Sequence, residues 1–337
     1  MRHIDSFSQR GFRFCYRARM SSAQVKIFDN TRQFSSAAVA AVVLLSIIFS
    51  NLIDASSITW QVVVALIALA LGIPHGALDH LVTLPRASVA RMALFISIYV
   101  AIAILAVWAI LEWSVFGFIG VVVMSALHFG IGDAAFISER DKAADQGHAT
   151  RVAQGIYALA GGSLPVVLPL TSDQSTRALA AVNEDLVNWH GGWDNELFNL
   201  VLVITVLAFL LLLVMKRVRD LIDLVLLAAL ALLTPPLVAF AAYFGLWHAM
   251  RHTARLTLNL RSSQNSISAN QAGKAFRQAV IPGIPALIGT FLVAATIGLT
   301  TPGKWSDEFL WLSLVVVWAL TVPHMMVTAR LDKAALK

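Results

Sequence analysis

Long runs of apolar residues separated by short polar segments dominate the chain from residue 35 onward. A helix needs about 20 such residues to cross the hydrocarbon core of a bilayer. The runs predict membrane-spanning helices over residues 35–53, 58–78, 92–111, 115–136, 152–170, 197–215, 275–299 and 309–328. One further run, 221–253, is too long for one ordinary span and short for two, and Thr234, Pro235 and Pro236 interrupt it. Proline lacks an amide donor and disfavours helical geometry in the residue before it, so we expect a turn and two helices here.

The distribution of Lys and Arg favours ten spans over nine. With ten spans and a cytoplasmic N-terminus, 23 of the 25 basic residues fall on the inner side, and only Arg177 and Lys304 fall outside. The positive-inside rule requires this asymmetry. If the proline segment were only a kink in one helix, the basic residues of the final third would lie on the outer side of the membrane. We therefore expect an all-α, polytopic integral membrane bundle of about ten transmembrane helices in the cell (inner) membrane, with both termini cytoplasmic.

Composition agrees with this class. Of 337 residues, 58% are hydrophobic and only 13% are charged, with a mean hydropathy of +0.75, which is unlike a soluble domain. The net charge of +6 is expected to lie in loops, so it does not indicate a nucleic-acid partner. Cys15 is the only cysteine, which excludes an internal disulfide and a thiolate metal cluster.

We expect one membrane-embedded domain over residues 35–330 and a short cytoplasmic tail over 331–337. Residues 1–34 are rich in Arg and Ser, and we interpret them as a basic cytoplasmic tail. A targeting peptide and a misassigned start are the alternatives for this segment.

Six of the nine histidines fall inside apolar segments, where ionisable groups are costly and mark function. They occur in the motifs GIPHGALDH (His75 and His80), ALHFGIGD (His128), LWHAMRH (His248 and His252) and VPHMM (His324). In the ten-span topology these motifs lie in the C-terminal halves of the second, fourth, eighth and tenth helices, all of which run inward. The histidines therefore share a similar depth, and convergence on one site is the simplest account.

The spacing of these residues suits metal binding. His248 and His252 are four residues apart, so they share a helix face and can grip one ion. His75 and Asp79 have the same spacing, which suits a ligand and a carboxylate that orients a ring. A lone membrane histidine is more often a hydrogen-bonding residue between helices, but the set together indicates a metal. Imidazole ligands suit iron, copper, nickel or zinc.

Other residues near the motifs have weaker signals. Asp79, His80, Asp133 and His324 are candidates for groups that surround the metal ligands. The aromatic residues Phe129, Tyr243, Phe244 and Trp247 could line a channel for a long apolar substrate, although packing and interfacial anchoring explain such residues more often.

From about residue 35 onward, the chain resembles the Brp/Blh family of bacterial and archaeal β-carotene dioxygenases, which supply retinal to microbial rhodopsins. The resemblance rests on the motifs PHGALDH, LHFGIGD and WHAMRH, in that order. The resemblance implies a membrane-embedded Fe²⁺ enzyme that splits the central double bond of β-carotene with O2 to give two molecules of all-trans-retinal. Its iron-binding histidines carry over onto His75, His128, His248 and His252. Another carotenoid or apocarotenoid substrate stays open, as does the choice between one metal and two.

Competing functions are weaker. A two-iron hydroxylase or desaturase needs more clustered histidines than the six available here. A metalloprotease needs a glutamate beside its histidines, as in HExxH, and these motifs contain none. The main alternative is a non-catalytic membrane protein, either a metal transporter or an accessory protein in retinal and opsin assembly.

Overall fold

The computed structural model describes residues 22–50, 58–84, 87–180, 182–300 and 307–337, and every regular element in these ranges is helical. The longer helices are α2 (Ser22–Ile48), α3 (Ile58–Gly76), α5 (Val89–Glu112), α6 (Ser114–Ala143), α7 (Arg151–Leu170), α9 (Asp194–Val214), α10 (Val218–Leu233), α12 (Ala249–Asn259), α15 (Ile284–Thr300) and α16 (Asp307–Ala335). The shorter ones are α4 (Asp79–Thr83), α8 (Asp173–Ala180), α11 (Pro236–Ala242), α13 (Gln264–Ser268), α14 (Ala272–Val280), the 3-10 helices η1 (Glu184–Leu186), η3 (Arg261–Ser263) and η4 (Ile281–Gly283), and the π-helix η2 (Tyr243–His248).

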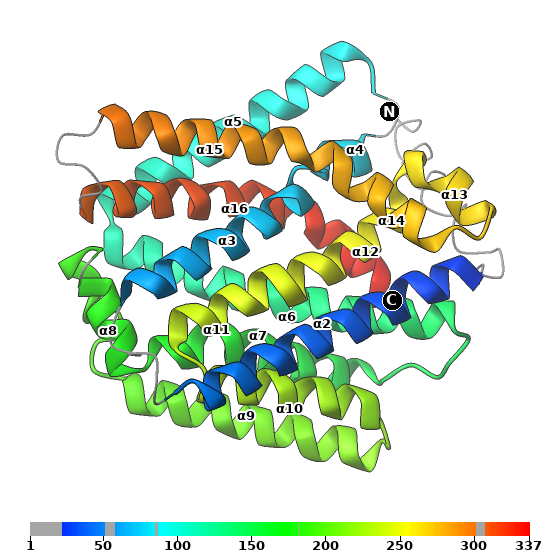
Figure 1. Ribbon diagram of the computed structural model, residues 1–337, viewed down its shortest axis with the longest axis horizontal. Coiled ribbons are helices and arrows are strands. Elements are labelled where there is room, and N and C mark those ends of the chain that lie inside the picture. The colour runs from blue at the N-terminus through cyan, green and yellow to red at the C-terminus, as the bar shows by residue number, and fades with distance from the viewer. Residues whose placement is uncertain (1–21, 51–57, 85–86, 181, 301–306) are drawn as a thin grey trace, which may run out of the picture.

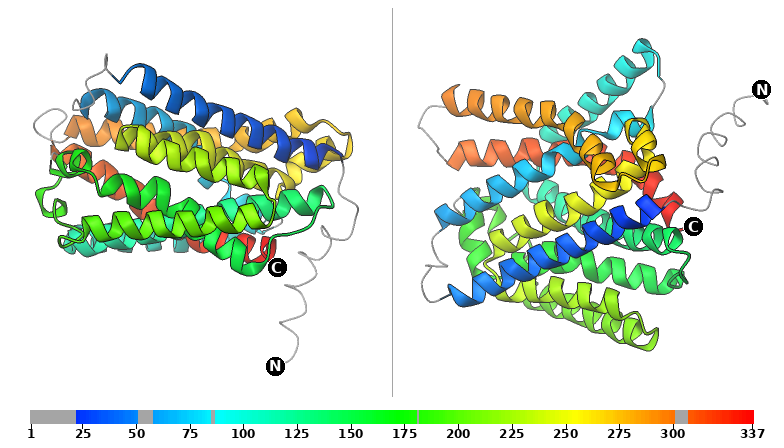
Figure 2. Two further views of the ribbon diagram at one scale, coloured as in Figure 1. Left: turned by 90° about the horizontal axis from the view of Figure 1, so that it is seen from below. Right: turned by 45° about the vertical axis from the view of Figure 1, so that its right-hand side comes forward.

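The long helices lie side by side in one bundle. Figure 1 shows α9 and α10 along one edge and α5 and α15 along the other. In the left view of Figure 2 the helices run roughly alongside one another, whereas in the right view they cross at clear angles. In the middle, α12 packs against α3 and α6, and α16 packs against α6. These four helices carry the histidine motifs.

Six helices of the described residues are long and apolar enough to cross a membrane: α2, α5, α6, α7, α9 and residues 314–335 of α16. The outward face of α5 is apolar, and Leu94, Ile104 and Leu105 are each about 60% exposed. Such a surface is typical of contact with lipid. The expected helical class with membrane-type helices is therefore confirmed, whereas the count of about ten spans is not.

The segment at Thr234 separates two helices, as the sequence predicts. Helix α10 ends at Leu233, Thr234 is extended (φ −121°, ψ 144°), and α11 begins at Pro236. The chain then runs back across the bundle through α11 and α12 (Figure 1). The single helix expected over 275–299 is wrong, because α14, η4 and α15 share this range. Pro282 lies in η4, between α14 and α15, where the missing amide donor favours a break.

The first and last described helices extend past residues 35 and 330, the expected boundaries of the membrane domain. Helix α2 begins at Ser22, so only residues 1–21 of the expected tail lie outside the described part. Arg32 is 4% exposed and pairs with Asp220 and Asp223 of α10. Because these carboxylates neutralise the guanidinium, it can lie in the interior rather than in a solvated tail. At the other end, α16 continues to Ala335, so residues 331–335 are helical and packed.

Two glycines allow α6 and α7 to cross at close range. A Cβ atom on Gly130 would overlap the carbonyl oxygen of Ala158, and one on Gly162 would overlap that of Ala126. Small residues at helix crossings allow the backbones to approach in this way. The close crossing fixes α6 at the turn that follows His128.

Candidate metal centre

Five histidine rings converge in the centre of the bundle, although they come from separate parts of the chain. His75 lies in the last turn of α3, His128 in α6, His248 at the end of η2, His252 in α12 and His324 in α16. None is more than 7% exposed. The centres of the rings in contact are 5.0–6.2 Å apart. The structure thus brings together the four histidines expected as ligands and adds His324, which the sequence placed among the weaker candidates.

Several ring nitrogens of this cluster have unmet bonding capacity. The Nε2 atoms of His128, His248, His252 and His324 are buried and have no hydrogen-bond partner among the described residues. Buried polar atoms in proteins nearly always have a partner, so a group of orphaned nitrogens needs an explanation. A bound metal ion supplies one, because neutral imidazole ligates through an unprotonated nitrogen. The residues present therefore fit a metal with nitrogen ligands.

The opposite nitrogens of three rings are held by other groups. Nδ1 of His324 lies 2.9 Å from Oδ2 of Asp79, and Nδ1 of His128 lies 3.4 Å from Oγ1 of Thr328. Nδ1 of His75 contacts the carbonyl oxygen of Gly72, which can accept its proton. Partners of this kind fix the orientation of metal-binding histidines and leave Nε2 free.

The cluster is slightly wider than an assembled metal site. Within the described residues, no three His, Cys, Asp or Glu side chains meet the geometry of a bound ion. A metal about 2.1 Å from each nitrogen would place neighbouring ring centres roughly 5 Å apart. The observed separations begin at this value, with 5.0 Å between His128 and His248, and reach 6.2 Å between His128 and His252. The ring separations therefore lie at or above the value expected for ligands of one ion.

Asp79 orients a different histidine from the one its spacing suggests. The expectation that His75 and Asp79 share a helix face is wrong, because α3 ends at Gly76 and a new helix, α4, begins at Asp79. Asp79 instead accepts hydrogen bonds from His324 and, at 3.2 Å, from the hydroxyl of Tyr99 on α5. His80 follows on α4 and lines the cavity described below.

Asp133 holds the π-helical segment rather than a histidine ring. Its Oδ2 accepts hydrogen bonds from Nε1 of Trp247 at 2.8 Å and from the hydroxyl of Tyr243 at 3.3 Å. Both aromatic side chains are fully buried (0% exposed). π-Helical turns are rare and frequently occur at functional sites. Here the π-helix ends at His248, so Asp133 helps to position that ring.

A cavity of about 290 Å³ adjoins the histidine cluster. His75, His128 and His324 form part of its wall, together with Phe129 and Phe244. Tyr243 and Trp247 are not among its lining residues, so the structure separates the four aromatic candidates into two pairs. The remaining wall comes mainly from apolar residues of α5, α15 and α16, including Phe95, Ala286 and Leu320. An apolar cavity with a few polar groups is the usual form of a small-molecule site.

Sequence reasoning missed the buried arginines of α12, the helix that carries His252, because it placed the basic residues in loops. On α12, Arg251 and Arg255 flank His252, and both are at most 1% exposed. Arg255 pairs with Glu139 of α6 at 3.0 Å and with Asp332 of α16 at 2.6 Å. The signal was present as two arginines in the same segment as two histidines. These ion pairs hold α12 against α6 and α16.

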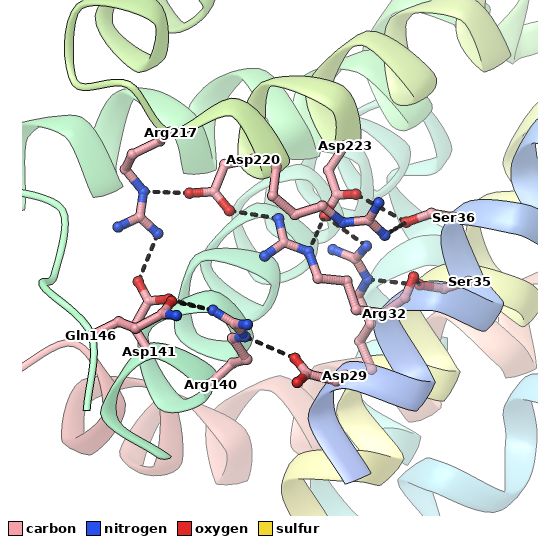
Figure 3. A network of polar contacts seen from close by, with 12 residues as sticks. Asp29, Arg32, Ser35, Ser36, Arg140, Asp141, Gln146, Arg217, Asp220 and Asp223 are labelled. Atoms are coloured by element: carbon pink, nitrogen blue, oxygen red, sulfur yellow. Dashed lines mark hydrogen bonds and ion pairs between the residues drawn. The ribbon is translucent and has the colours of Figure 1, made fainter. Parts of the chain in front are cut away.

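Arg251 belongs to a larger network of charges, shown in Figure 3. Asp223 accepts hydrogen bonds from Arg251 and from Arg32. Arg32 also pairs with Asp220, which contacts Arg217. From Arg217 the chain of contacts continues through Asp141 and Arg140 to the partly exposed Asp29. The network joins α2, α6, α10 and α12 at the end of the bundle where the chain enters α2.

The comparison with protein families gives one match. The family model described as "Beta-carotene 15,15'-dioxygenase" matches residues 66–332, which is most of the chain and includes every histidine of the cluster. No curated protein and no solved structure matches the chain. The chain therefore belongs to the β-carotene 15,15'-dioxygenase family.

Proposed function

We propose that the protein is a membrane-embedded, Fe²⁺-dependent dioxygenase that cleaves the central double bond of β-carotene with O2 and releases two molecules of all-trans-retinal. The observation that carries this proposal is the cluster of buried histidines beside an apolar cavity, in which four Nε2 atoms have no partner among the described residues. Family membership supports a carotenoid as the substrate. His75, His128, His248 and His252 would hold the iron.

The iron would supply the activation of O2, and the protein would supply binding, orientation and exclusion of side reactions. In the overall reaction one C=C bond breaks and two C=O bonds form. One molecule of O2 therefore provides both oxygen atoms, and no reductant is needed.

The cavity favours entry of the substrate from the bilayer. β-Carotene is too apolar to arrive through water, and the cavity wall includes residues of α5, α15 and α16. On α15, Phe291 and Leu292 are 57% and 64% exposed, so this side of the bundle offers an apolar surface. The cavity of about 290 Å³ lies at the lower end of the range of about 300–1,000 Å³ for drug-sized ligands. The long polyene would extend beyond it along these helices.

The length of the path past the iron would determine the cleaved bond. Holding a reactant in one geometry next to the reacting centre is a large part of enzymatic rate acceleration. If a ring of the substrate is stopped at a fixed distance, the central double bond lies opposite the iron and the symmetric substrate gives one product. Retinal made in this way would serve a microbial rhodopsin.

Purified protein loaded with iron and supplied with β-carotene and O2 tests the proposal. We expect retinal without longer apocarotenals, and labelled O2 should show how its two atoms are distributed between the products. A mixture of unequal aldehydes would contradict central cleavage. Absence of cleavage of any carotenoid by the iron-loaded protein would favour the accessory-protein alternative.

A further inference from the structure

The arrangement of ring contacts among the five histidines has the connectivity of a square pyramid. Each ring contacts every other ring except in two pairs, His75 with His128 and His248 with His324, which are not in ring contact in the described structure. His252 contacts all four others and occupies the apex. In a square pyramid each ligand at the base neighbours all the others except the one opposite. The two missing pairs are therefore the diagonals of the base.

The sides of this base are nearly equal. The four ring separations around it are 5.5 Å, 5.0 Å, 5.2 Å and 5.2 Å, taken from His75 through His248, His128 and His324 back to His75. The apex is less regular, because His252 lies 5.3 Å from His75 but 6.2 Å from His128. Without His324, one corner of the base would be missing.

We propose that His324 is a fifth ligand of the metal, which would then be held by five imidazoles. This inference rests on the proposed function of the histidine cluster. Nε2 of His324 is buried without a partner, as in three of the other rings. Its Nδ1 is held at 2.9 Å by Asp79, which leaves Nε2 as the nitrogen that could bind a metal. A ring held only for packing would not need both features.

The proposed fifth ligand lies where the cluster meets the cavity. His75, His128 and His324 line the cavity, whereas His248 and His252 do not. His324 therefore belongs to the part of the cluster that adjoins the proposed substrate site.

Tyr99 is a positioning residue in this arrangement. It lines the cavity from α5, and its hydroxyl donates to the same oxygen of Asp79 that holds His324. The chain Tyr99–Asp79–His324 thus connects the helix at the cavity wall to the fifth ligand. Loss of the Tyr99 hydroxyl should let the His324 ring move more freely without removing it from the cluster.

The number of imidazole ligands, measured by X-ray absorption at the iron edge of the purified holoprotein, tests the inference without reference to activity. We expect five in the wild type and four in His324→Ala, and added imidazole should restore the fifth. Asp79→Asn should retain the ring but weaken Fe²⁺ binding by about 10–100-fold in competition with a chelator, and Tyr99→Phe should weaken it less. His190→Ala is the control, because His190 lies outside the cluster and the cavity lining, and its metal affinity should not change.

Four imidazoles in the wild type, or the same number in wild type and His324→Ala, would overturn the inference. If His324→Ala does not fold, the wild-type ligand number and the affinity of Asp79→Asn decide. If the wild-type protein forms retinal and its iron has only four imidazoles, His324 is not a ligand but the proposed function stands. Five imidazoles in an iron-loaded protein that cleaves no carotenoid would reject the proposed function alone.

Discussion

Nη2 of Arg251 lies 2.9 Å from Oδ2 of Asp223, and the two side chains are 1% and 0% exposed. The same carboxylate oxygen accepts a hydrogen bond from Nε of Arg32 at 2.8 Å. One buried carboxylate therefore joins α2, α10 and the helix that carries His252. The position of α12 therefore depends on this contact as well as on apolar packing.

Replacing Asp223 with alanine should destabilise the protein strongly. Arg251 and Arg32 would each lose their ion pair with Asp223, and an uncompensated buried charge typically costs about 3–5 kcal/mol. Unfolding by denaturant in a fixed detergent measures the change. Asp194→Ala is the control, because the side chain of Asp194 is 40% exposed. Equal unfolding midpoints for the two variants would show that the buried pairs contribute little.

Alanine at any one of His75, His128, His248 or His252 should remove bound iron and carotenoid cleavage together. These rings converge in the bundle, so each would contribute one ligand nitrogen. Metal analysis of the purified variants, with a measurement of secondary structure, checks this. His190→Ala should be nearly neutral, because His190 lies in the connection before α9. Full iron occupancy in His248→Ala would remove that residue from the ligand set.

Gly162→Ala should destabilise the crossing of α6 and α7. The added methyl would overlap the carbonyl oxygen of Ala126, and overpacking of a close contact typically costs about 1–3 kcal/mol. Gly155→Ala is a matched control in the same helix, since no atom lies within 4 Å of its added Cβ. That control should be neutral or slightly stabilising, because alanine favours a helix more than glycine does. Similar thermal stability of both variants would contradict the close crossing.

Ala286→Phe should narrow the cavity from α15 and slow β-carotene cleavage while iron binding is retained. Ala286 lines the cavity, whereas the ligand histidines lie on other helices. Ile288→Phe places the same ring on the same helix at a position that is 55% exposed and outside the cavity lining. Rates with saturating β-carotene, together with iron content, distinguish the two. An unchanged rate in Ala286→Phe would mean that the substrate does not pass this wall.

Reporter fusions test the expected topology. Fusions that end near Thr234 should report the external side and those near Arg261 the cytoplasmic side, because α10 and α11–α12 run in opposite directions. Both termini should also report the cytoplasm. An internal signal at both positions would leave nine spans and reverse the later part of the chain.

The sequence alone was sufficient for features that one residue type determines by itself. Such a residue acts through its backbone geometry or through the cost of placing it in an apolar environment. The apolar runs predicted helices of the membrane type, and the prolines at 235 and 236 predicted the break before α11, because proline has no amide donor for a helical hydrogen bond. Pro282 likewise interrupts the helix expected over 275–299, whereas Pro165 and Pro323 lie inside helices. The motifs also located the histidines, because ionisable groups in apolar segments are costly enough to stand out.

Only the tertiary structure decided which of these residues meet. His324 and Asp79 are far apart in the sequence, and their contact depends on how α16 packs beside the break between α3 and α4. Spacing suggested His75 as the partner of Asp79, but periodicity holds only inside an uninterrupted helix. The buried positions of Arg32, Arg251 and Arg255 likewise depend on carboxylates from other helices. The sequence by itself determined which groups are chemically capable, and packing determined their partners, because a charge is stable in the interior only where the fold supplies its counter-charge.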